Sequence, residues 1–355
     1  MSLWPHALAV CLGFMLAFAA AAEGVDPSPA TNWESYKARF LSEDGRIVDE
    51  AGGRMVSHSE GQGYGMLLAA FNGDAPAFDR MWTWTQANLY VRGDDLAAWR
   101  WVPGDWPHVL DTNNATDGDI LIAWALAEGG QRFNRADYVE RARRIAHIVA
   151  WSLTYRAPFG LALSPAKFGY GPKDSEDGPV VNPSYWVYPA FLAFERITPE
   201  VDWRKIASGG RALLKVSARG DRHLPADWIS LRGAPHPAKG HPAEFGYDAL
   251  RVPLYLAWGD PADRADLAPY AQGWARADAP LATVPLDESA KPQESAKPEA
   301  LDAPGYQAVA ALTRCVAKGE AFPRALRAPA FDLYYPSTLH MLVLAALAQR
   351  PFPCA

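Results

Sequence analysis

Apolar residues spaced three and four apart recur along most of the chain, and this helical periodicity constrains the fold more than any other feature. The spacing is clear in 33–41, 78–86 and 120–127, and it is typical of helices with one buried face. Further helices are predicted at 136–151, 184–197, 202–216, 243–258, 304–317 and 332–349. Alternation typical of strands is scarce, and 161–163 and the region around Val180 are the best short candidates. Helices in series without alternating strands predict an all-α fold.

The length of 355 residues allows one large domain or two ordinary ones. Alanine, proline and charge dominate 260–304, where Glu-Ser-Ala-Lys-Pro occurs twice, at 288–292 and 294–298. Because helical periodicity resumes afterwards, we expect one domain over 23–355 with a flexible surface insertion at about 260–304. Helix pairs that close into a toroid suit this length, but periodicity alone does not distinguish a toroid from an open solenoid.

The first 22 residues have the pattern of a secretory signal peptide. Residues 7–22 are almost entirely apolar and end in four alanines, which suits cleavage after Ala22. This run is short for a membrane-spanning helix, and no later segment is long and apolar enough to span a bilayer. We therefore expect a periplasmic or secreted protein without a membrane span. Cys315 and Cys354 remain after cleavage, and the sequence leaves open whether they form a disulfide or two free thiols.

Charge and aromatic content narrow the classes of ligand. The net charge is −6 without any basic block, which argues against nucleic acid as a partner. The chain has 14 tryptophans, and Trp99, Trp101 and Trp106 lie in a loop-like stretch. Tryptophans at this frequency either fill a large core or line a groove where flat aromatic faces stack on sugar rings.

Glu60 lies where a glycine-rich stretch meets an apolar run. Gly61, Gly63 and Gly65 follow it, and 66–71 is apolar, so Glu60 is predicted in the first turn of a helix. A carboxylate there is favoured by the helix dipole. Alternatively, the glycines admit the close approach of a ligand, and Glu60 is then a candidate acid.

The segment 113–119 also precedes an apolar helix. Thr116 and Asp119 resemble a capping box, with Asp in place of the usual Glu or Gln. This interpretation leaves Asp117 without a local structural role.

Two later segments carry further candidates. In 182–186, Ser184 is a candidate cap, and Tyr185 is either a core residue or faces a cleft. In 245–253, Asp248 and Arg251 are three residues apart, which also suits a simple pair on one helix face.

The sequence lacks the motifs of several other chemistries. It has no nucleophile elbow, Walker loop, dinucleotide-binding fingerprint or zinc-protease motif, and its eight histidines lack metal-like spacing. We therefore expect no metal and no cofactor. Carboxylates at helix starts with many aromatics suit glycoside hydrolysis, which needs one acid to protonate the leaving oxygen and one carboxylate to activate water or attack.

Four segments resemble glycoside hydrolase family 8 in the family's order. They are SEGQGYGM at 59–66, ATDGD at 115–119 followed by Ile122-Ala123, NPSY at 182–185, and YDALRV at 247–252. The similarity runs from about Trp33 to about Leu344 and is greatest to the periplasmic endoglucanases associated with bacterial cellulose synthesis. One such motif is a weak signal, whereas four in order are a strong one.

The resemblance implies an (α/α)6 barrel with a substrate groove across one end, and hydrolysis of a β-1,4-glucan chain with inversion and without a metal. Position by position, it makes Glu60 the general acid and Asp248 the general base, with Tyr185 helping to hold the attacking water. It also makes Asp117 a ligand of the sugar at the cleavage point. Arg251 is then expected to orient Asp248.

Tyr64, Trp101 and Trp106 are expected to form stacking walls of the groove. The acid and base carboxyl groups of an inverting enzyme lie roughly 6.5–9.5 Å apart. Glu60 must also be protonated near neutral pH, although a helix start favours its anion, and we expect the like charge of Asp117 to oppose that ionisation.

The expected function is therefore that of an endo-β-1,4-glucanase, linked to the cellulose synthase and export machinery. One alternative is the same fold acting on xylan or chitosan. A second is a non-catalytic glucan-binding partner in cellulose export, which is disfavoured because binding alone does not require both Glu60 and Asp248.

Overall fold

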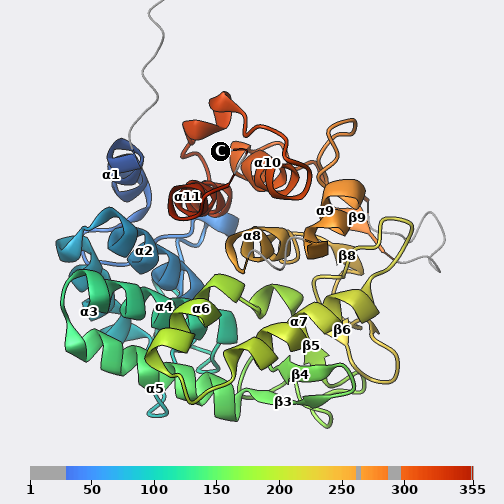
Figure 1. The fold of residues 1–355 in the computed structure, drawn as a ribbon. Coiled ribbons are helices and arrows are strands. Elements are labelled where there is room, and N and C mark those ends of the chain that lie inside the picture. Colours follow the sequence, from blue (N-terminus) through green and yellow to red (C-terminus); the bar gives the residue numbers. More distant parts are fainter. Residues whose placement is uncertain (1–28, 261–264, 287–296, 353, 355) are drawn as a thin grey trace, which may run out of the picture.

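The computed structural model describes residues 29–260, 265–286, 297–352 and 354, and within them the fold is all-α as predicted (Figure 1). Six inner helices close a ring in which each packs on the next. In ring order they are α2 (Ser59–Asn72), α4 (Thr116–Arg132), α6 (Tyr188–Ile197), α8 (Arg251–Trp258), α10 (Pro304–Lys318) and α11 (Tyr334–Gln349). The ring returns from α11 to α2, so the chain forms an (α/α)6 barrel and not an open solenoid.

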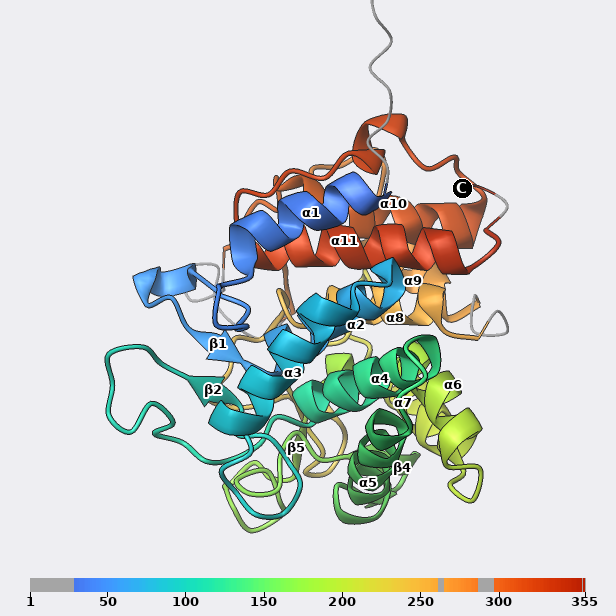
Figure 2. The same cartoon turned by 90° about the vertical axis from the view of Figure 1, so that its left-hand side faces the viewer.

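The outer helices each cover an inner one. They are α1 (Pro29–Phe40), α3 (Ala75–Asn88), α5 (Ala136–Ser152), α7 (Trp203–Ser217) and α9 (Ala268–Gly273). Helix α1 packs on both α2 and α11, which brings the two ends of the described chain together (Figure 2). The other outer helices α3, α5, α7 and α9 pack on α2, α4, α6 and α10 respectively.

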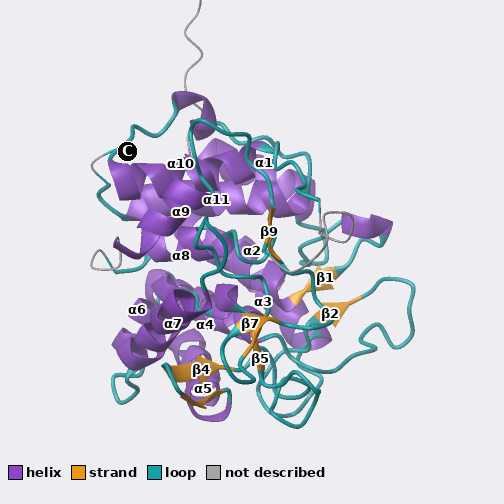
Figure 3. Cartoon of the chain, turned by 90° about the vertical axis from the view of Figure 1, so that its right-hand side faces the viewer, coloured by secondary structure: helices purple, strands orange, loops and turns teal. Residues whose placement is uncertain are grey.

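Short antiparallel strands lie mostly at the end of the barrel where the inner helices begin (Figure 3). They pair as β1 (Ser57–His58) with β2 (Arg100–Trp101), β3 (Thr154–Ala157) with β4 (Gly160–Leu163), and β8 (Glu244–Phe245) with β9 (Val284–Pro285). A three-stranded sheet joins β5 (Val180–Val181), β6 (Ile229–Ser230) and β7 (His236–Pro237). Since β1 directly precedes α2, and β5 and β8 come shortly before α6 and α8, these strands fix the loops that begin three inner helices.

Close contact between α2 and α4 explains the glycines around Glu60. A Cβ on Gly63 would lie 2.5 Å from the Cβ of Leu121, and a Cβ on Gly118 would overlap Ser59. The expectation that the glycines after Glu60 clear space for a ligand is therefore wrong. Gly63 and Gly118 let α2 and α4 approach closely where both begin, whereas a Cβ on Gly65 would meet the side chains of Ile47 and Met81.

The segment expected to be a flexible surface insertion at about 260–304 contributes side chains to the core within 265–286, which corrects the expectation for that part, whereas 297–300 is exposed. Helix α9 lies in it, and Leu267, Tyr270 and Trp274 are buried. A six-residue helix is too short to show periodicity, which is why the sequence did not indicate it. The first Glu-Ser-Ala-Lys-Pro copy and the start of the second lie outside the described residues.

The predicted helix at 243–258 is also only partly correct. Strand β8 and a turn occupy 244–250, and α8 begins at Arg251. The turn replaces helix because the carboxylate of Asp227 accepts the backbone N–H groups of Gly246 and Ala249, which competes with helical pairing.

Cys315 and Cys354 form a disulfide, with their Cα atoms 5.5 Å apart. The bond joins the end of α10 to the C-terminal segment, across 39 residues. The expected signal peptide, with Cys11, lies outside the described residues. In the part of the chain that the structure describes, no helix has the length and apolarity needed to cross a bilayer.

Candidate active site

Three inner helices begin at one place and each brings a charged side chain to it. Glu60 and Asp117 are the second residues of α2 and α4, as the sequence predicted, and Arg251 is the first residue of α8. Asp248 lies in the turn before α8, three residues from Arg251. Residues that are up to 191 positions apart in the sequence therefore meet at one end of the barrel.

Arg251 connects the three carboxylates of the site. Its Nη1 donates to Glu60 Oε1 and to Asp117 Oδ2, the latter at 3.1 Å. Its Nη2 donates to Asp248 Oδ1 at 2.8 Å and to Ser184 Oγ at 2.8 Å. The side chain is 3% exposed. A buried guanidinium with four side-chain acceptors holds a planar arrangement that a lysine would not reproduce.

Glu60 also accepts a hydrogen bond from the hydroxyl of Tyr64, one helical turn later, at 3.1 Å. The Tyr64 hydroxyl is in turn hydrogen-bonded to that of Tyr255 on α8. On the other side, His58 caps α2 by accepting the N–H of Gly61 at 2.9 Å. Tyr64 and Arg251 therefore hold the carboxylate, while His58 fixes the first turn of the helix that carries it.

The expected repulsion between Glu60 and Asp117 is offset in this structure, because Arg251 donates to both. A cation between two carboxylates favours their ionised forms. Arg251 therefore places one positive charge beside both carboxylates at the start of α2 and α4.

Asp117 is buried, and its burial raises its pKa to about 7, with the charge of Asp119 adding to the shift and the N–H of Gly118 opposing it. The capping box expected for Thr116 and Asp119 is wrong. Thr116 Oγ1 donates to the Ser164 carbonyl, and Asp119 instead accepts the backbone N–H of Ala97 at 2.8 Å. The backbone N–H of Ala97 is buried and needs an acceptor, and the Asp119 carboxylate supplies it, which fixes the loop before α4.

Asp248 is the most open of the three carboxylates, with 34% of its side chain exposed. Asn182 Nδ2 donates to its Oδ2 at 3.0 Å. Burial, together with the charge of Asp117, raises its pKa to about 6, while hydrogen bonds from Asn182 and Trp228 oppose the shift. The hydroxyl of Tyr185 has a raised pKa, because of burial and the nearby charges of Asp117 and Asp248. Tyr185 ends the short turn Pro183–Tyr185, which packs on α4 and α8.

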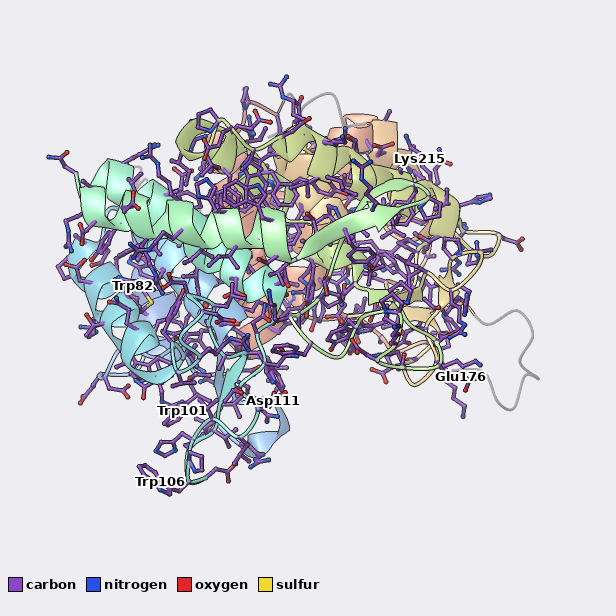
Figure 4. The ribbon with its side chains drawn as sticks, turned by 90° about the horizontal axis from the view of Figure 1, so that it is seen from below. Trp82, Trp101, Trp106, Asp111, Glu176 and Lys215 are labelled. Carbon is purple, nitrogen blue, oxygen red and sulfur yellow. A yellow bond between two sulfur atoms is a disulfide. The ribbon has the colours of Figure 1, made fainter. Side chains whose placement is uncertain are left out.

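The three expected stacking residues differ in position. Tyr64 is 1% exposed, so its ring offers no face to a sugar, and this corrects the expectation for Tyr64. Trp101 is half-buried, with its ring against Trp84 and His108. Trp106 is 87% exposed and projects from the loop that follows β2 (Figure 4). The other named tryptophan of this stretch, Trp99, donates to Asp111.

Several residues of the site were not assigned a role from the sequence. Ser184 was expected to cap the helix predicted at 184–197, but α6 begins at Tyr188 and Asn182 caps the short turn Pro183–Tyr185 instead. Only the fold shows that Asn182 binds Asp248 and that Ser184 binds Arg251. Tyr255 and Trp228 gave no signal at all. The contact between Tyr64 and Glu60 could have been predicted from the sequence, since residues four apart on a helix face each other.

Comparison with known proteins agrees with this arrangement. The sequence model described as glycosyl hydrolases family 8 matches residues 3–349. A probable endoglucanase of Novacetimonas hansenii is 39% identical over 92% of this chain and 93% of its own.

Two solved structures are similar over most of the chain. An endo-β-1,4-glucanase from Acetobacter xylinum is 38% identical, covers 90% of this chain and 98% of its own, and superposes with a TM-score of 0.76. A second endo-β-1,4-glucanase of the same family, from an Achatina fulica gut metagenomic library, is 37% identical, covers 90% of this chain and 98% of its own, and gives a TM-score of 0.78.

Proposed function

The chain belongs to glycosyl hydrolases family 8, and from this premise we propose that it is an endo-β-1,4-glucanase that acts with inversion. The observation that carries the proposal is the bridge by one buried guanidinium from Glu60 to Asp117 and Asp248 at the barrel end. Two relatives of similar length are described as endo-β-1,4-glucanases, which supports the choice of substrate.

In the proposed mechanism, Glu60 protonates the oxygen of the leaving sugar, and Asp248 removes a proton from the attacking water. The water adds to the anomeric carbon on the opposite face as the glycosidic bond breaks. Asp248 suits the role of base because it is partly open to solvent while Asn182 and Arg251 fix its two oxygens. Tyr185 helps to hold the water, and Asp117 binds the sugar at the cleavage point.

Arg251 has two roles in this account. It orients Asp248, and it stabilises Glu60 as the carboxylate that remains after proton donation. One turnover leaves Glu60 ionised and Asp248 protonated, so a proton must leave Asp248 and another must reach Glu60 before the next.

The choice of polymer is tested by product analysis on carboxymethyl cellulose, xylan and chitosan. We expect a rapid fall in the viscosity of carboxymethyl cellulose and release of cello-oligosaccharides, with much slower release from the other two. Faster release from xylan or chitosan would assign the barrel to that polymer. Absence of reducing ends from all three, with retained binding, would favour the non-catalytic glucan-binding partner.

The pH dependence follows from Asp248. A general base works only when it is ionised, and the pKa of this carboxyl is raised to about 6. As pH falls below about 6, kcat/KM on a soluble cello-oligosaccharide should therefore fall about tenfold per pH unit. Full activity retained down to about pH 4, the ordinary value for Asp, would contradict this assignment.

We also propose that the enzyme is exported and trims glucan during cellulose synthesis. The signal-like pattern of 1–22 and the resemblance to endoglucanases of that setting support it. Deletion of the gene should change the yield or crystallinity of cellulose in a producing host, and an unchanged polymer would leave a degradative role instead.

A further inference from the structure

Asp227 lies beneath the turn that carries Asp248 and has no part in the mechanism above. Its Oδ1 accepts the N–H of Gly246 at 2.7 Å and that of Ala249 at 2.8 Å. Its Oδ2 faces the N–H of Asp248 at 3.3 Å. One buried carboxylate therefore accepts hydrogen bonds from three of the four backbone N–H groups of 246–249.

The segment around Asp227 is itself well anchored. The N–H of Asp227 donates to the Glu244 carbonyl at 2.9 Å, and strand β6 begins two residues later. The next residue, Trp228, reaches the Asp248 carboxylate through its indole. Its ring is stacked with Tyr170 and with His241. Consecutive residues thus hold the main chain and the side chain of Asp248.

Placing the Asp227 and Asp248 carboxylates close together is electrostatically unfavourable unless the hydrogen bonds from the backbone N–H groups compensate for the repulsion. Burial, together with the charge of Asp248, raises the pKa of Asp227 to about 7 against the opposing effect of the three backbone donors. A buried acid beside another acid destabilises the ionised pair, whereas backbone N–H groups stabilise a carboxylate that accepts them. The carboxylate of Glu244 also lies close to Gly246.

We propose that Asp227 is a positioning residue that fixes the 246–249 turn so that the Asp248 carboxylate stays aligned with Arg251, Asn182 and the attacking water. The inference rests on the proposed role of Asp248 as general base. A shift of the base by about 1 Å can reduce the rate of a reaction about 100-fold, so the backbone of this turn controls the rate without touching substrate.

The test uses Asp227→Asn in the full-length protein. The amide oxygen can still accept from Gly246 and Ala249, but the NH2 group then meets the N–H of Asp248, donor against donor. We expect kcat on cellopentaose to fall about 10- to 100-fold, while the dissociation constant for cellotetraose, measured by calorimetry, changes less than about twofold. The loss should be equal on a dinitrophenyl cello-oligosaccharide, because a good leaving group does not replace a misplaced base.

Two further variants keep the proposal falsifiable if Asp227→Asn folds poorly. Gly246→Ala retains the Asp227 charge, but its Cβ would lie 2.7 Å from Asp227 Oδ2, so it should give the same loss of kcat without loss of binding. Asp177→Asn is the matched control, since Asp177 is also buried and accepts a backbone N–H, from Lys239 at 2.8 Å. It should leave kcat within about threefold.

Unchanged kcat in both Asp227→Asn and Gly246→Ala would overturn the inference, and so would a parallel loss of binding that shows general damage to the groove. These outcomes are distinct from failure of the proposed function, in which the unmodified protein releases no sugars or Asp248→Asn remains active.

Discussion

Replacing Glu60 by Gln is expected to lower hydrolysis of cello-oligosaccharides by about 100- to 10,000-fold. Gln lacks the proton that the leaving oxygen needs, yet its amide oxygen can accept from Arg251 and from Tyr64 as the carboxylate does. The barrel and the groove should therefore persist. Reducing-end release measures the loss, and calorimetry with cellotetraose should show nearly unchanged binding.

The leaving group shows whether the lost function is that of an acid. A dinitrophenyl cello-oligosaccharide departs without protonation, so Glu60→Gln should recover most of its rate on it. The matched control is Glu128→Gln on α4, where the carboxylate also binds an arginine, Arg196, and an aromatic N–H, from Trp124. Its activity should be close to that of the unmodified protein, and an equal loss would show that the site is merely sensitive to helix packing.

Replacing Asp248 by Asn is expected to reduce kcat by a similar factor, about 100- to 10,000-fold, because no other group accepts the proton of the attacking water. The amide oxygen of Asn can accept a hydrogen bond from either Arg251 or Asn182, but its NH2 group then faces whichever of these two donors is left. Binding should weaken only slightly. Stopped assays on cellopentaose give the rate.

The dinitrophenyl substrate separates this variant from the first. Asp248→Asn should be equally impaired on both substrates, since the water still needs a base when the leaving group needs no acid. Recovery of Asp248→Asn by the good leaving group, or retention of activity on cellopentaose, would remove Asp248 from the role of base.

Much of the barrel was predictable because its helices are long and periodic. Helices α3, α5, α7, α10 and α11 lie within a few residues of their predicted ranges. Short elements were not predictable, since α9 and the turn that follows β8 depend on partners distant in the sequence. The turn at 246–249 forms because Asp227 accepts its amides, and no local pattern indicates that pairing.

The site follows the same division. Glu60 and Asp117 were identifiable from their place at helix starts, and their family motifs named the roles to test. The contacts of Arg251 with three carboxylates were not identifiable from the sequence, because a spacing of three from Asp248 is equally typical of a simple pair on one helix face. Only closure of the ring brings α2, α4 and α8 together and makes one guanidinium serve three carboxylates.

The stereochemistry of the first product tests the central claim most directly. Proton NMR of cellopentaose hydrolysis, recorded before the sugars mutarotate, reports the configuration at each new reducing end. An inverting reaction between Glu60 and Asp248 predicts the α-anomer as the first product. The β-anomer would show retention, which requires the two carboxyl groups to lie about 5–5.5 Å apart with one acting as nucleophile, and it would contradict this account.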